Sequence, residues 1–116
     1  MAAAQRVTFR FGLTGRRWGL IGPVVLLLQA HEASAQRLEH MIEPLVASGR
    51  QVIALDDPTQ PSAAKAARVD EYAVAITEAA AEMPRLEAIV SEGLGSAAAA
   101  RALEYGLSVE HALLLG

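Results

Sequence analysis

The stretch from Leu86 to Arg101 contains the residues whose types and spacing come closest to a reaction site. A mostly apolar run, 86–90, leads into Ser91-Glu92-Gly93-Leu94-Gly95-Ser96 and then into a series of alanines. This pattern is typical of a buried strand that enters a tight turn and leaves as a helix. Such a turn can carry a nucleophilic serine at its apex. The apex residue here is Gly93, so the question is whether any chemistry remains at this turn.

Three side chains near Gly93 carry groups that could react. Ser91 and Ser96 flank the apex, and either hydroxyl is a candidate for a displaced nucleophile. The competing interpretation is that Ser91 packs at the strand end and that Ser96 hydrogen-bonds to nearby backbone. Glu92 could pair with His31, which follows the first buried strand, and such a pair can act as a general acid or base. The competing interpretation here is that both are solvated loop residues.

The segment from Gly93 to Ala98 also matches G-x-G-x-x-A, the dinucleotide-binding fingerprint. That fingerprint requires an acidic residue about 20 positions further on. The corresponding position falls at or beyond Gly116, directly after three leucines. Glu92 beside the turn would also repel a phosphate. We therefore expect no nucleotide cofactor.

Composition argues against several other kinds of site. The chain has no cysteine, which excludes disulfides, thiolate metal sites and cysteine nucleophiles. His31, His40 and His111 lie far apart without ligand spacing, so we expect no metal. The net charge is −3 and the arginines are scattered, so no basic face is available for nucleic acid.

Length and hydropathy predict one globular domain, residues 1–116. Hydrophobic residues make up 53% of the chain and charged residues 20%, which is a globular composition. The first residues lack the basic-then-apolar order of a secretory signal. The longest apolar run, 23–28, is far shorter than the roughly 20 residues of a membrane span. We expect a soluble cytoplasmic protein without a membrane partner.

The predicted elements alternate along the chain. Residues 7–11 and 16–18 form a hairpin, and strands follow at 24–28, 51–55, 86–90 and 109–115. Helices are expected around the apolar stripe of 38–46, from a cap at Asp70 to Pro84, and at 94–105, with 59–67 as a loop. Pro44 should bend the first of these helices, and Gly49 should end it. The order predicts a three-layer α/β fold, in which helices cover both faces of a mostly parallel sheet.

The order and spacing of four segments resemble a known family. They are "PVVLLL", "RLEHMIEPLVASG", "QVIALDDP" and "LEAIVSEGLGSAAAARAL". Together with the opening hairpin they are similar to the N-terminal half of α/β-hydrolase-fold proteins, the serine esterase and lipase-like group. The resemblance extends from about Val7 to Leu115.

The resemblance implies a nucleophile elbow whose motif has changed. The family's G-x-S-x-G aligns with residues 91–95, so Gly93 stands where the serine belongs and cannot form an acyl-enzyme. The backbone N–H groups of Ala30 and Leu94 occupy the oxyanion-like positions. The family's D-x-P-G-H-G turn reads Asp56-Asp57-Pro58-Thr59-Gln60-Pro61 here. The family's acid and histidine follow later strands, whereas this sequence ends at Gly116.

These departures predict a non-catalytic, hydrolase-derived protein that acts through binding or assembly. The alternative is a hydrolase that uses Ser91, Ser96 or the His31–Glu92 pair with residues supplied by a partner. The last strand, residues 109–115 from Val109 to Leu115, should be an apolar open edge, which invites pairing. We expect a homodimer or a partner chain there, unless the sequence is part of a longer product. The sequence indicates no particular small-molecule ligand.

Overall fold

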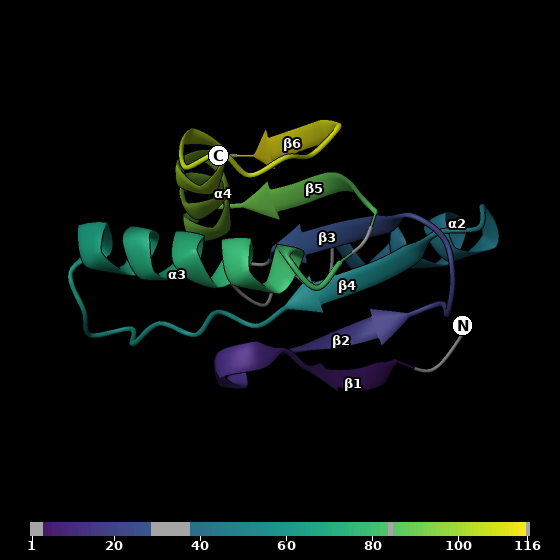
Figure 1. Cartoon of the computed structure of the whole chain (residues 1–116), viewed down its shortest axis with the longest axis horizontal. Coiled ribbons are helices and arrows are strands. Elements are labelled where there is room, and N and C mark those ends of the chain that lie inside the picture. The colour runs from purple at the N-terminus through teal and green to yellow at the C-terminus, as the bar shows by residue number, and fades with distance from the viewer. Residues whose placement is uncertain (1–3, 29–37, 84, 116) are drawn as a thin grey trace.

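A twisted sheet runs through the computed structural model, which describes residues 4–28, 38–83 and 85–115. Within these residues the strand order is β1-β2-β4-β3-β5-β6 (Figure 1). The first three strands in this order pair antiparallel, and β4, β3, β5 and β6 pair parallel. The bounds are β1 Gln5–Thr8, β2 Thr14–Trp18, β3 Val24–Leu28, β4 Gln51–Leu55, β5 Leu86–Glu92 and β6 His111–Leu115. The predicted α/β class, the mostly parallel sheet and the N-terminal hairpin are confirmed.

β3 is the centre of the sheet, as its unbroken apolar sequence predicts. Every residue from Val24 to Leu28 is 3% exposed or less. A strand with neighbours on both sides and a helix layer on each face has no polar surroundings, so both faces of its pleat are apolar.

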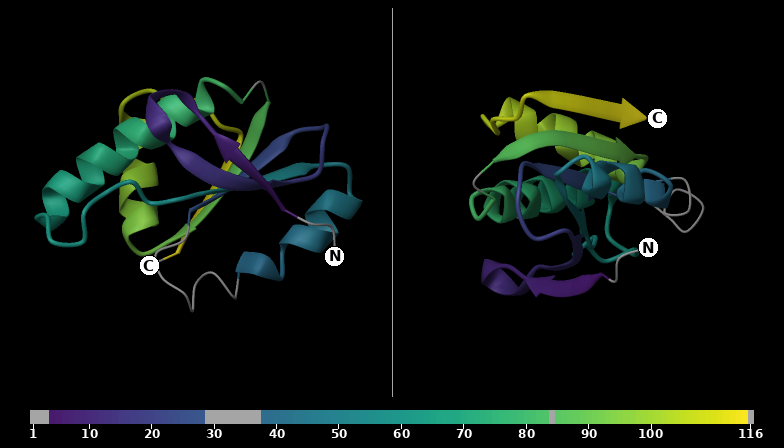
Figure 2. Two further views of the ribbon diagram at one scale, coloured as in Figure 1. Left: turned by 90° about the horizontal axis from the view of Figure 1, so that it is seen from below. Right: turned by 90° about the vertical axis from the view of Figure 1, so that its right-hand side faces the viewer.

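Helices cover both faces of the sheet (Figure 2). Helix α2 (Ile42–Ala47) lies on one face, where Ile42 and Leu38 pack with Trp18, Val25 and Val52. Helices α3 (Lys65–Ala80) and α4 (Leu94–Glu104) lie on the other face. Their buried side chains, which include Tyr72, Ile76, Ala98 and Ala102, pack on Leu26, Leu28 and Ile53. The three predicted layers are therefore present.

Several boundaries differ from the sequence predictions; the last strand, for example, begins at His111 instead of Val109. Residues 10–12 form a short 3₁₀ turn (Arg10–Gly12) instead of continuing the first strand, because the Phe9 N–H closes on the Leu13 carbonyl at 2.7 Å. Helix α3 begins at Lys65 instead of near Asp70, because the Asp70 side chain accepts hydrogen bonds from Arg101 and Tyr105 instead of capping a helix. Pro44 lies in the first turn of α2, where proline needs no backbone donor, so it fits near the start of this helix instead of bending its middle.

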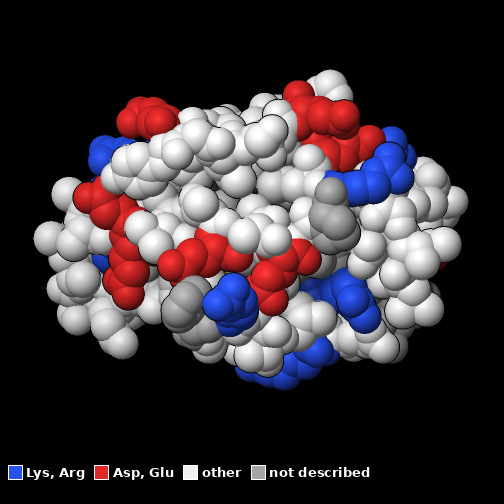
Figure 3. All heavy atoms as spheres, viewed as in Figure 1, with Lys and Arg blue, Asp and Glu red and all other residues white. Residues whose placement is uncertain are grey.

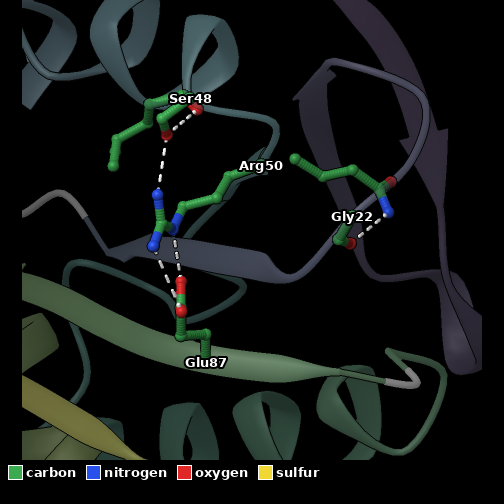
Figure 4. A network of polar contacts seen from close by, with 6 residues as sticks. Gly22, Ser48, Arg50 and Glu87 are labelled. Atoms are coloured by element: carbon green, nitrogen blue, oxygen red, sulfur yellow. Dashed lines mark hydrogen bonds and ion pairs between the residues drawn. The ribbon is translucent and has the colours of Figure 1, made fainter.

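An ion pair ties the amino ends of the parallel strands together. Arg50, just before β4, donates from Nε to Oε1 of Glu87 on β5 at 2.5 Å, and from Nη1 to the Ser48 hydroxyl at 2.7 Å (Figure 4). Because β3 lies between β4 and β5, the pair spans the central strand. The guanidinium lowers the pKa of the Glu87 carboxyl, mainly through this hydrogen bond.

The two edges of the sheet differ in chemistry. β1 carries Gln5, Arg6 and Thr8 on its exposed positions, whereas all five residues of β6 are exposed, three of them leucines. Acidic and basic side chains are interspersed on the face shown in Figure 3, and no basic band crosses it. None of the helices in the described part of the chain is long and apolar enough to cross a bilayer.

Candidate functional site

A sharp corner joins β5 to α4, and Gly93 is the single residue between them. Its backbone has φ 58° and ψ −128°, and the residue is exposed. Positive φ of this kind is nearly free for glycine and strained for residues with a Cβ. The corner therefore presents backbone alone at the apex, with no side-chain group.

Helix α4 leaves the corner pressed directly against β3. A Cβ added at Gly95 would lie 2.9 Å from the Leu28 Cβ and 3.0 Å from the Leu28 carbonyl oxygen. Real Cβ atoms essentially never approach this closely, so only glycine fits the first turn of α4 here. This contact fixes where α4 begins relative to the carboxyl end of β3.

The two serines that flank Gly93 form a directed chain of hydrogen bonds. The Ser91 and Ser96 Oγ atoms are 3.0 Å apart, and the Ser96 hydroxyl donates to the Leu115 carbonyl oxygen at 2.6 Å. A serine has one O–H proton, and a carbonyl oxygen can only accept. Since the Ser96 proton is given to Leu115, Ser91 must donate to Ser96. The chain runs Ser91 to Ser96 to Leu115.

Burial separates these two hydroxyls. Ser91 is 0% exposed, whereas Ser96 in the first turn of α4 is partly exposed. The Ser91 hydroxyl is therefore closed to solvent, and the Ser96 hydroxyl donates to backbone instead of to a base. Ser91 packs at the end of β5, and Ser96 bonds to a backbone carbonyl, although this acceptor lies 19 positions away instead of in the nearby backbone.

Other predicted site residues lie around the same corner. Glu92 is the last residue of β5 and is 6% exposed. Leu94 is the first residue of α4, where a helix leaves its N–H without an internal acceptor. Ala30 and His31 lie outside the described residues, so the proposed His31–Glu92 pair and the Ala30 amide stay predictions.

His111, in contrast, lies far from the corner. It pairs with Ala88 at the amino end of β6, four residues before Leu115, whose carbonyl accepts from the Gly93 N–H at 3.3 Å. Four residues of strand extend about 13 Å. This imidazole is therefore too distant to serve as a base for a group at Gly93.

The turn after β4 is held by a network centred on Asp57. Its Oδ1 accepts from the backbone N–H and the hydroxyl of Thr59, at 2.8 and 2.6 Å. Arg68 on α3 donates to Thr59 Oγ1 and to Asp57 Oδ2, both at 2.9 Å. Asp56 accepts from the Thr14 hydroxyl at 2.7 Å. Both aspartates are engaged in stabilising the turn.

Sequence reasoning missed two of these participants. Leu115 acts through its backbone carbonyl, which no side-chain pattern can reveal. Arg68 directly follows residues 59–67, which the sequence predicts to be a loop, so its hydrogen bonds to the turn after β4 are not predicted. The available sequence signal for this ion pair is an arginine eleven positions after Asp57.

Three solved structures that are similar to this chain are each longer than it. A thioesterase domain from the curacin biosynthetic pathway superposes with a TM-score of 0.76 at 21% identity, over 98% of this chain and 47% of that chain. One of a set of novel epoxide hydrolases of the α/β-hydrolase superfamily, from metagenomes of hot environments, superposes with a TM-score of 0.70 at 22% identity. The match covers 98% of this chain and 42% of that chain. A cold-adapted esterase from an Arctic intertidal metagenomic library superposes with a TM-score of 0.59 at 18% identity. The match covers 96% of this chain and 58% of that chain.

The described part of the chain has a partial α/β-hydrolase fold. The resemblance inferred from the four sequence segments is therefore confirmed at the level of fold. This chain spans less than two thirds of the length of each of these solved chains. No protein-family model matches the chain, and no curated protein matches it.

Proposed function

We propose that this chain is a non-catalytic α/β-hydrolase-fold protein that acts through binding or assembly. The observation that carries the proposal is Gly93 at the corner between β5 and α4. In a hydrolase elbow this position supplies the nucleophilic hydroxyl. A glycine offers no atom that can form a covalent intermediate with a carbonyl carbon.

The neighbouring hydroxyls support the same proposal. A nucleophilic serine needs an exposed Oγ and a base that accepts its proton. Ser91 is fully buried, and the Ser96 proton is donated to a backbone carbonyl. Neither arrangement meets both requirements.

The alternative is a hydrolase that uses a serine beside the corner. It is favoured by the placement of two hydroxyls and the Glu92 carboxyl within one helical turn of Gly93, and by the names of the similar structures, which are hydrolases. In this alternative the acid and base come from a partner or from residues outside those described, such as His31.

A labelling experiment distinguishes the two functions. The folded chain is treated with a fluorophosphonate probe and with short-chain nitrophenyl esters, alongside Ser91→Ala and Ser96→Ala variants. We expect no probe adduct and no turnover above that of the variants. An adduct on wild-type protein that is lost in one serine variant would refute the proposal and identify the nucleophile.

Gly93→Ser is the matched positive test. It places a hydroxyl at the apex without changing the two flanking serines. If this variant gains probe labelling that the wild type lacks, then the remainder of the site is competent and Gly93 alone accounts for the inactivity. If the wild type is labelled as strongly as the variant, the proposal fails.

A further inference from the structure

We draw no further inference here: the strongest candidate, the glycine-flanked turn between β2 and β3 at which Leu20 and Ile21 are 72% and 80% exposed, carries nothing because no feature of the described residues shows what covers it.

Discussion

The Ser96 hydroxyl donates to the Leu115 carbonyl at 2.6 Å and accepts the proton of the buried Ser91 hydroxyl. The first turn of α4 is thereby bonded to the end of β6, and the order of donors is fixed. Ser96 is the middle residue of this series of hydrogen bonds, whereas Ser91 is its first donor.

The two serines should therefore differ in their effect on stability. Ser96→Ala leaves the Ser91 proton without its acceptor in a fully buried site, and we expect a loss of about 1–3 kcal/mol. Ser91→Ala leaves the bond from Ser96 to Leu115 intact, and we expect less than about 1 kcal/mol. Urea unfolding of both variants measures the difference. Equal losses would contradict the donor order.

The backbone at Gly93 predicts a conformational penalty for any side chain. Gly93→Ala should destabilise the fold by about 1–3 kcal/mol, because alanine is strained at this positive φ. Gly95→Ala should also destabilise the fold, but through its clash with Leu28. Urea unfolding of both variants measures the two losses. A Gly95→Ala variant as stable as the wild type would contradict the close contact with Leu28.

Tyr72 is completely buried, and its hydroxyl has no hydrogen-bond partner among the residues that the structure describes. Burial raises the pKa of this phenol, and the charges of Asp57 and Asp56 add to the rise. Tyr72→Phe removes the buried polar atom, so we expect it to stabilise the chain by about 1 kcal/mol. Tyr105→Phe, on an exposed residue, should change stability by less than about 0.5 kcal/mol. A destabilised Tyr72→Phe would reveal a partner for the hydroxyl.

Alkaline titration gives an independent test of Tyr72. Because its pKa is raised in the folded state, its contribution to stability is present below the ordinary tyrosine pKa, about 10, and is lost as pH rises further. Wild-type protein should therefore lose stability at alkaline pH faster than Tyr72→Phe. Parallel curves for the two proteins would contradict the buried, proton-retaining phenol.

The ion pair between Arg50 and Glu87 predicts an acid-sensitive contribution to stability. The lowered pKa of Glu87 means that the contribution is present above the ordinary glutamate pKa, about 4.3, and is lost as pH falls through the lower folded value. Glu87→Gln should destabilise the fold near pH 7 and approach the wild-type stability in acid. The double variant Arg50→Gln/Glu87→Gln should be less destabilised than the two single losses combined. Strict additivity would mean that the pair is not coupled.

The order of strands and helices was predictable because it depends on local pattern. β3 can be recognised from its apolar run, and the ends of α2 and α4 can be recognised from the glycines that follow them. Each signal lies in a few adjacent residues. The start of α3 was not predictable, since Asp70 has the side chain of a cap but accepts hydrogen bonds instead from Arg101 on α4 and from Tyr105 directly after it. These hydrogen bonds of Asp70 depend on where α4 lies in space, which the local sequence does not specify.

The candidate site also has features that depend on adjacent residues and features that depend on the fold. Gly93 could be assigned to the corner because strand, turn and helix are contiguous in the sequence. The bond from Ser96 to Leu115 joins residues 19 positions apart through a backbone carbonyl, which carries no residue signature. Local chemistry was therefore foreseeable, and the contact that orders the two serines required the fold.

The polar first strand limits how far strand pairing can extend. β1 carries Gln5, Arg6 and Thr8 on its exposed positions, and its charge and polarity make it a poor match for the leucines of β6. The two edges of the described sheet therefore have little complementarity for one another, which disfavours the head-to-tail stacking of copies that would build a filament.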